Sequence, residues 1–170
     1  MTLRSPIETA RLVIAPLAEA DATELSAITD HPDIIRRVHF LAAPFDADRA
    51  RALIVSDPGF NGMRRVADGR LVGVAGAHDR GNAVEIGYWV GPAWQRRGYA
   101  REAIVALLGE LRGRPVYAEC DPANTVSWRF LVSLGFAPGG EPGRRPGREI
   151  LRHAGPSRSD YAGLPGSTGL

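Results

Sequence analysis

The segment WQRRGYAREAI, residues 94–104, combines glycine, small residues and positive charge where helix-forming sequence begins. The start of a helix leaves about four backbone N–H groups without intrahelical partners, and their aligned dipoles make this end electropositive. Gly98 has no side chain to keep a bulky anion from the backbone, and Ala100 keeps the first turn narrow. Arg96 and Arg97 add formal charge. The segment therefore predicts a site for a pyrophosphate group.

The alternative interpretation of this short pattern is a glycine-containing loop whose arginines only face water. The surrounding sequence favours the anion site, because a strand ending in Gly91-Pro92 precedes the segment and an amphipathic helix follows it. The segment lacks the G-x-x-x-x-G-K-[ST] pattern of ATP-hydrolysing phosphate loops, so that class of site has no support.

The elements that would position this segment follow from apolar periodicity and from turn residues. In the first third of the chain the expected elements are a strand at 11–17, a helix at 21–28, one or two helical turns at 33–40 and a helix at 46–57. Residues 62–90 indicate an antiparallel three-stranded meander, with Asp68-Gly69 as its first turn. The remaining elements expected before Phe136 are a helix at 98–112, a strand at 116–120 and a helix at 124–135.

After Phe136 the sequence is rich in Gly, Pro, Ser and Arg, and only residues 148–153 are typical of a strand. Residues 1–154 are therefore expected to form one domain. We expect residues 155–170 to be a disordered tail, because this composition cannot bury enough apolar surface to offset the entropy of the chain.

Length and composition limit the class of protein. The 170 residues suit a single domain, and 44% hydrophobic and 24% charged residues are ordinary for a soluble globular protein. No apolar run approaches the roughly 18 residues of a membrane span, and the first residues have no signal-peptide pattern. One cysteine, Cys120, cannot form an internal disulfide, which agrees with a cytoplasmic location. A net charge of +2 gives no argument for binding nucleic acid or membranes.

Two segments together resemble the GNAT superfamily of acyl-CoA-dependent N-acetyltransferases. The stretch EIGYWVGPAWQRRGYAREAI matches its [QR]-x-x-G-x-[GA] signature at a strand-to-helix junction, through Gln95, Gly98 and Ala100. The stretch ECDPANTVSWRFLVSLGF is similar to its second segment, in which Asn124 opens a helix that ends in Gly-Phe. The sequences of both segments and of the opening ETARLVIAPL are similar to those of the ribosomal-protein-alanine N-acetyltransferase branch. The likeness covers residues 9–136.

This resemblance implies an α/β (α+β) fold: a mixed, mostly antiparallel sheet flanked by helices on both faces, with two splayed central strands. It also implies acetyl-CoA as the cofactor, with the pyrophosphate on the backbone N–H groups of residues 96–100 and the pantetheine arm in the gap between the splayed strands. The cofactor-binding residues expected on this basis are Trp89, Val90, Gln95, Arg96, Arg97, Gly98, Tyr99, Ala100 and Asn124.

The implied reaction is direct attack of a primary amine on the acetyl thioester. Because such amines have a pKa of about 8 to 10, the acceptor must lose a proton first, and a base is needed. Glu85 is the candidate, since strand alternation places it on one face with Gly87 and Trp89, and the resemblance implies a Glu on this strand acting through water. The alternative is a carboxylate paired with an arginine, and Glu119 and Asp121 are weaker candidates for the base.

The candidate acid departs from many relatives. Those carry a tyrosine four residues before the Gly-Phe glycine, whereas this chain has Leu131. Ser127 is therefore the candidate to hydrogen-bond the thiol sulfur, with a first-turn serine bonded to the backbone as the equal alternative. Asn124 is ambiguous in the same way, because Asn is a preferred N-cap residue.

The acceptor side is the least defined part of the prediction. His39 and Phe40 between the early helices, and Gly87 beside the candidate base, are the expected substrate residues. The four histidines have no spacing that suits a metal site, so no metal is expected. The expected partner is a small-molecule amine or a peptide N-terminus, and a monomer and a homodimer both remain open.

Two other classes of function remain open. A non-catalytic module that binds acyl-CoA or another phosphate-bearing metabolite would keep the loop without the chemistry. A structural protein would use the same arginines only as a solvated surface.

Overall fold

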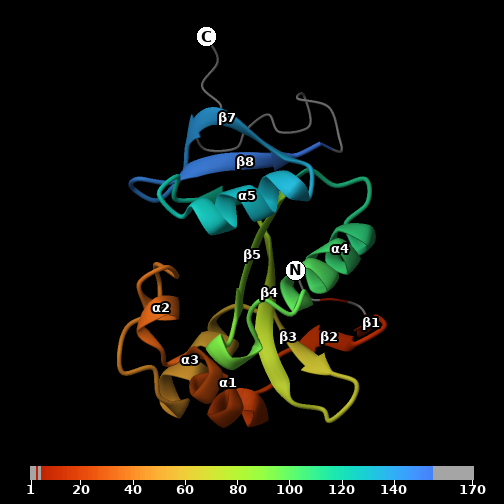
Figure 1. Cartoon of the computed structure of the whole chain (residues 1–170), viewed down its shortest axis with the longest axis vertical. Coiled ribbons are helices and arrows are strands. Elements are labelled where there is room, and N and C mark those ends of the chain that lie inside the picture. Colours follow the sequence, from red (N-terminus) through yellow and green to blue (C-terminus); the bar gives the residue numbers. More distant parts are fainter. Residues whose placement is uncertain (1–2, 4, 155–170) are drawn as a thin grey trace. The chain divides into compact units, whose positions relative to one another are not determined.

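The computed structural model describes residue 3 and residues 5–154. The expected disordered tail, residues 155–170, lies outside the described residues. The chain forms two compact units (Figure 1). Of the described residues, the first unit holds those up to His78 together with Tyr88–Gly109, and the second holds Asp79–Gly87 and residues 110–154.

Among the described residues, eight strands form a mixed and mostly antiparallel sheet, in the order β1-β2-β3-β4-β5-β6-β8-β7. In the first unit, β1 (Ile7–Glu8), β2 (Leu12–Pro16), β3 (Phe60–Arg65) and β4 (Leu71–Asp79) are antiparallel neighbours. The strand β5 (Val84–Val90) follows β4. The predicted meander and the mixed α/β fold class are therefore confirmed.

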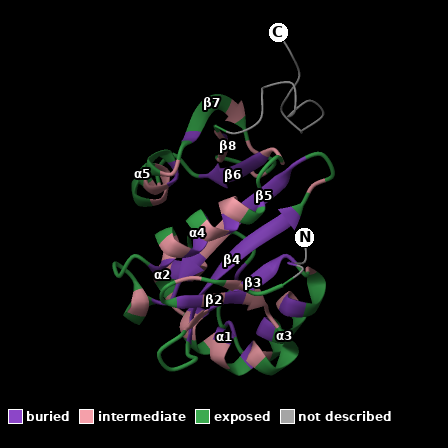
Figure 2. Ribbon diagram, turned by 90° about the vertical axis from the view of Figure 1, so that its right-hand side faces the viewer, coloured by how far each residue is buried: buried purple, intermediate pink, exposed green. Residues whose placement is uncertain are grey.

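The turn between β3 and β4 follows the sequence prediction. Gly69 has a φ of 69°, in the left-handed region that glycine tolerates, and its N–H donates to the Arg65 carbonyl at 2.8 Å. The strand β4 that leaves this turn is buried along its length up to His78 (Figure 2). A near-continuous apolar run such as LVGVAGA is what burial on both faces requires.

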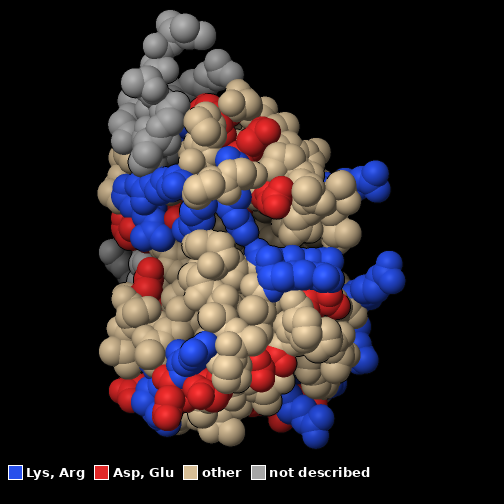
Figure 3. Space-filling view, turned by 90° about the vertical axis from the view of Figure 1, so that its left-hand side faces the viewer, with Lys and Arg blue, Asp and Glu red and all other residues tan. Residues whose placement is uncertain are grey.

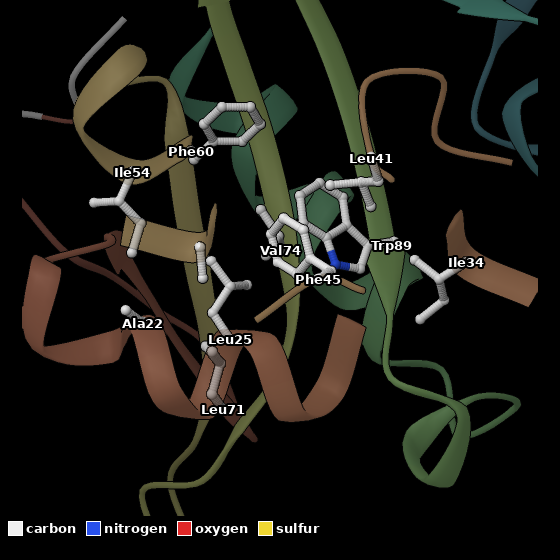
Figure 4. Packing of buried hydrophobic residues seen from close by; sticks show 11 residues of the cluster. Ala22, Leu25, Ile34, Leu41, Phe45, Ile54, Phe60, Leu71, Val74 and Trp89 are labelled. Atoms are coloured by element: carbon white, nitrogen blue, oxygen red, sulfur yellow. The ribbon is translucent and has the colours of Figure 1, made fainter. Parts of the chain in front are cut away.

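Three helices, α1 (Ala22–Thr29), α2 (Pro32–Ile35) and α3 (Ala47–Ser56), pack against the sheet of the first unit. Figure 4 shows their apolar side chains meeting those of β3, β4 and β5 in one cluster, with Trp89 near its centre. The predicted start of α3 is confirmed, because the Asp46 carboxylate accepts from the Arg49 N–H at 2.9 Å. The expected turns at 33–40 amount to the single short helix α2.

The helix α4 (Tyr99–Glu110) follows β5 after a short 3-10 turn at Pro92–Trp94. Its buried positions are Tyr99, Ala103, Ile104 and Leu107, which recur at helical spacing. The loop predicted to bind an anion therefore lies directly before a helix with one apolar face.

The second unit contains β6 (Val116–Cys120), α5 (Thr125–Ser133), β7 (Phe136–Pro142) and β8 (Glu149–His153). Val84, Glu85 and Ile86 of β5 pair in parallel with Val116, Tyr117 and Ala118 of β6. The β6 strand is antiparallel to β8, which is antiparallel to β7. The splay of two central strands stays an expectation from the family resemblance.

The strand β7 corrects the sequence analysis, which expected only one strand after Phe136. Its sequence, FAPGGEP, has few residues that favour strands, and only Phe136 is buried. Backbone pairing with β8 forms it nevertheless, with an irregular register between Pro138 and Glu141. Tertiary pairing here overrides a local sequence that indicates a loop.

Candidate active site

The loop before α4 has the backbone shape that anion binding requires. Arg96 has a φ of 60° and Gly98 a φ of 82°, so two left-handed residues turn the chain within three positions. Within the described part of the chain, the N–H groups of residues 96–100 have no hydrogen-bond acceptor. These amides at a helix start suit a phosphate or pyrophosphate group.

The Gln95 side chain fixes the loop to the end of β5. Its Nε2 donates to the Val90 carbonyl at 3.0 Å. The structure therefore brings together Val90, Gln95 and the loop that follows, as the family resemblance implied. The Gln95 side chain itself bonds the backbone of this segment.

Arg11 is a third arginine at this loop, and sequence reasoning missed it. Its guanidinium donates to the Arg97 carbonyl at 2.9 Å and lies 4.9 Å from the centroid of the Tyr99 ring. A Cβ added at Gly98 would stand 3.2 Å from the Arg11 guanidinium. The absence of a side chain at Gly98 thus keeps the backbone and this cation close together.

Glu102 in the first turn of α4 connects the helix to the segment between β1 and β2. Its carboxylate accepts from the Thr9 hydroxyl at 2.6 Å and from the Arg11 Nε at 2.6 Å. Burial alone would raise the pKa of Glu102, but the bonds from Thr9 and Arg11 outweigh it and lower that pKa. The ion pair therefore orients Arg11 towards the loop.

An open cavity of about 480 Å³ lies beside this ion pair, in the first unit. Its lining residues are Thr9, Arg11, Gly98, Arg101, Glu102, Val105 and Ala106. Arg11 in this lining is paired with Glu102, and Val105 and Ala106 give the cavity an apolar side.

The predicted acceptor residues His39 and Phe40 form a ring group with Trp89. The Phe40 ring lies 4.9 Å from that of His39 and 6.1 Å from that of Trp89, between ring centroids. Phe40 is 43% exposed, whereas Trp89 is 7% exposed and donates from its indole N–H to the Thr29 hydroxyl at 2.9 Å. Trp89 is thus a core residue, and Phe40 presents an aromatic surface.

His78 has a carboxylate partner that its sequence position did not indicate. Its Nδ1 lies 2.7 Å from Asp57 Oδ2, and its ring packs edge-on against Phe60 at 4.7 Å. Burial alone would raise the pKa of Asp57, but the Gly59 N–H and His78 outweigh it and lower that pKa. The pair holds the end of β4 to the segment before β3.

Glu85 is buried and held by two guanidinium groups in the second unit. Its Oε2 accepts from the Arg80 Nε at 2.9 Å, and its Oε1 accepts from Arg145 at 2.6 Å. Burial alone would raise the pKa of Glu85, but Arg145 and then Arg80 outweigh it, so the pKa is lowered. The structure thus gives Glu85 the arginine partners that the alternative interpretation described.

Glu119 shares one of these partners. Its Oε2 accepts from Arg145 at 3.0 Å, and its Oε1 accepts from the Arg144 N–H at 3.1 Å. Gly87, two residues beyond Glu85, has only open space where a Cβ would stand. A side chain would thus meet no neighbour at Gly87, and the use of this space by a substrate stays a prediction.

Asn124 caps α5, since its side-chain oxygen accepts from the Ser127 N–H at 3.3 Å. The Cys120 thiol donates to the Asp121 carbonyl at 3.5 Å, and a side-chain hydrogen bond with Ser127 lowers the pKa of this thiol. Burial raises the pKa of Cys120 more than this bond lowers it, so the thiol is a poor nucleophile. The capping interpretation of Asn124 is thus observed, and it leaves a contact with a cofactor open.

Charge on the surface is mixed. Figure 3 shows several groups of basic side chains with acidic side chains close by, on the face that it draws. Among residue 3 and residues 5–154, no group of three His, Cys, Asp or Glu residues could hold a metal ion. The helices described here are all too short or too polar to cross a membrane.

Comparison with known proteins defines the class. The family model for the acetyltransferase (GNAT) domain matches residues 11–137, so the chain belongs to the GNAT acetyltransferase family. The match includes the loop before α4 and the cap of α5. No protein with curated annotation matches the chain.

Several solved structures share the fold. A GNAT-family acetyltransferase from Bacillus anthracis is 20% identical, with a TM-score of 0.71 over 87% of this chain and 95% of that one. The ribosomal-protein-S5-alanine acetyltransferase from Vibrio fischeri is 14% identical, with a TM-score of 0.72 over 87% and 94%. The microcin C7 self-immunity acetyltransferase MccE, solved with acetyl-CoA and AMP, is 17% identical, with a TM-score of 0.71 over 85% and 92%.

Proposed function

We propose that this chain is an acetyl-CoA-dependent N-acetyltransferase whose acceptor is a primary amine, either a peptide N-terminus or a small molecule. The observation that supports this most strongly is the row of open amides at residues 96–100, within a chain of the GNAT family. MccE, which has the same fold, was solved with acetyl-CoA, and this supports the same coenzyme here. We expect the protein to work in the cytoplasm.

The chain's own residues would hold the coenzyme by its phosphates. The amides of residues 96–100 would donate to the pyrophosphate, and Arg11 and Arg97 would add charge at the same helix end. Acetyl-CoA supplies an activated acetyl thioester when bound. The overall reaction converts it and an ammonium group into an amide, a free thiol and one proton.

Glu85 is the proposed base for that proton. Its lowered pKa keeps it a carboxylate at neutral pH, which is the form that accepts a proton. The same arginines that lower the pKa also weaken its basicity, so a base at this position works best when one arginine moves away. Ser127 is proposed to act on the thiol sulfur, and this requires its hydroxyl to leave Cys120.

A thiol-release assay tests the activity. Purified protein is given acetyl-CoA and a panel of small primary amines and peptides with different first residues. We expect release above background with at least one acceptor. No release across the panel, with acetyl-CoA binding intact, would contradict the proposal.

The arginine partners of Glu85 also favour a second candidate, a non-catalytic module that binds acyl-CoA. A carboxylate held on both oxygens is well suited to structure and poorly suited to proton transfer. Tight coenzyme binding without turnover, together with a retained protein partner, is the result that this candidate predicts.

A further inference from the structure

One nitrogen of Arg145 lies between two carboxylates that come from different strands. Its NH1 is 2.6 Å from Glu85 Oε1 on β5 and 3.0 Å from Glu119 Oε2 on β6. The Glu85 side chain is 7% exposed and that of Glu119 is 0% exposed, whereas that of Arg145 is 24% exposed. The cation therefore lies on the solvent side of the two carboxylates.

Tyr117 stands on the same face of the sheet as these carboxylates. Tyr117 is the partner of Glu85 in the parallel ladder, so both side chains stand on one face, and Glu119 follows two residues later on that face. Tyr117 is 1% exposed, and within the described residues its hydroxyl has no hydrogen-bond partner. Burial raises the pKa of Tyr117, and the charges of Glu85, Arg144, Arg80 and Glu119 also act on it. A buried hydroxyl without a partner is costly, which points to a group that binds there.

The turn that carries Arg145 is anchored independently of its side chain. The Arg148 guanidinium donates to the Glu119 carbonyl at 3.1 Å, and the Arg144 N–H donates to the Glu119 carboxylate at 3.1 Å. A Cβ at Gly143 would stand 2.9 Å from Glu119 Oε2, so glycine lets the turn lie against this carboxylate. The Arg145 side chain can thus leave while the turn stays in place.

We propose that Glu85, Glu119 and Tyr117 form a subsite for the ammonium group of the acceptor, which Arg145 fills until the acceptor displaces it. A primary ammonium has three N–H donors, and the subsite offers two carboxylates and one phenol oxygen. Displacement would put an ammonium in place of the Arg145 guanidinium beside Glu85, and an ammonium, unlike a guanidinium, can give up a proton to this carboxylate. The inference rests on the proposed acetyl transfer and makes Arg145 a residue that determines acceptor affinity.

Thermal unfolding with n-butylammonium chloride as the probe tests the subsite without acetyl-CoA. In Arg145→Ala the subsite is open, and the probe at about ten times its Kd raises the Tm by about 3 °C. The wild type shows a smaller rise, because Arg145 competes. Arg144→Ala is the matched control, since the contact of Arg144 with Glu119 is made by its backbone. It removes the same formal charge from the same turn while Arg145 stays in place, so its rise is expected to stay below that of Arg145→Ala.

Two further comparisons assign the effect to these groups. Tetramethylammonium chloride carries the same charge without N–H donors and is expected to leave the Tm of Arg145→Ala unchanged. Adding Tyr117→Phe or Glu119→Gln to Arg145→Ala reduces the rise given by n-butylammonium. Equal shifts with both probes, or equal shifts in Arg145→Ala and Arg144→Ala, overturn the proposal.

The wild type gives a measurement that does not depend on a variant folding. The NMR signal of the Arg145 Nε–H, assigned by its loss in Arg145→Lys, is expected to move as n-butylammonium chloride is added. A signal that stays in place up to saturating probe overturns the displacement. Neither measurement uses turnover. If the probe binds but the protein transfers no acetyl group, the proposed function is rejected and the subsite stands. Acetyl transfer without probe binding would reject only the subsite.

Discussion

Glu85 couples the charge of a single residue to the stability of the second unit. Its carboxylate is buried, and Arg80 and Arg145 hold it on both oxygens. Its pKa in the folded chain is lowered from the ordinary value of 4.5. A lowered carboxyl pKa stabilises the fold fully above the unfolded value, and this stabilisation is lost as the pH falls through the folded pKa.

Glu85→Gln tests this coupling. At pH 7 the free energy of unfolding is expected to fall by about 3 kcal/mol, because a buried ion pair loses one partner. The difference from the wild type should narrow as the pH falls below 4.5. Urea unfolding between pH 7 and pH 2.5 measures both quantities. A difference that is constant over this range would show that the charge of Glu85 does not stabilise the fold.

Glu110→Gln is the matched control for that series. Glu110 is exposed at the end of α4, so its variant should follow the wild-type pH profile.

The start of α5 has two proposed roles, capping of the helix by Asn124 and contact of Asn124 with the coenzyme. Asn124→Ala removes the bond from the Ser127 N–H and is expected to cost about 1 kcal/mol of stability. Asn124→Asp keeps a capping oxygen and should retain that stability. If Asn124 also contacts the coenzyme, its Asp variant binds coenzyme A more weakly because of the added negative charge. Unfolding and calorimetric titration of both variants distinguish the roles, and equal affinities would leave Asn124 a cap alone.

The elements that sequence predicted well are those with local signals. The Asp46 cap, the Asp68-Gly69 turn and the apolar stripe of α4 each involve residues within a few positions of one another. The strand β7 was missed because its partner strand supplies what its own sequence lacks. Local patterns therefore gave the helices and most strands, and pairing between distant segments decided the rest.

The part of the candidate site that one continuous segment forms was predictable from the sequence. The contacts between residues far apart in the chain were not. Residues 95–100 carry their own pattern, and the structure gives that loop open amides. Arg11 joins the loop across 86 positions and Arg145 reaches Glu85 across 60, and no local spacing indicates either contact. From the sequence alone, arginines whose partners lie that far away cannot be distinguished from arginines that face water.

For the molecule as a whole, the account depends on a coenzyme phosphate bound by the loop before α4. Gly98 has a φ of 82° and lies close to Arg11, so a methyl group there strains the loop and crowds the anion. Gly109→Ala is the matched control, because a Cβ at Gly109 on the same helix meets only open space.

Calorimetric titration of coenzyme A into the wild type and these two variants is the most direct test. We expect Gly98→Ala to bind about tenfold more weakly than the wild type, as losing one or two backbone hydrogen bonds would require. Gly109→Ala should bind as the wild type does. Equal affinity in all three proteins, or no binding to the wild type, would contradict the claim that this loop holds the coenzyme.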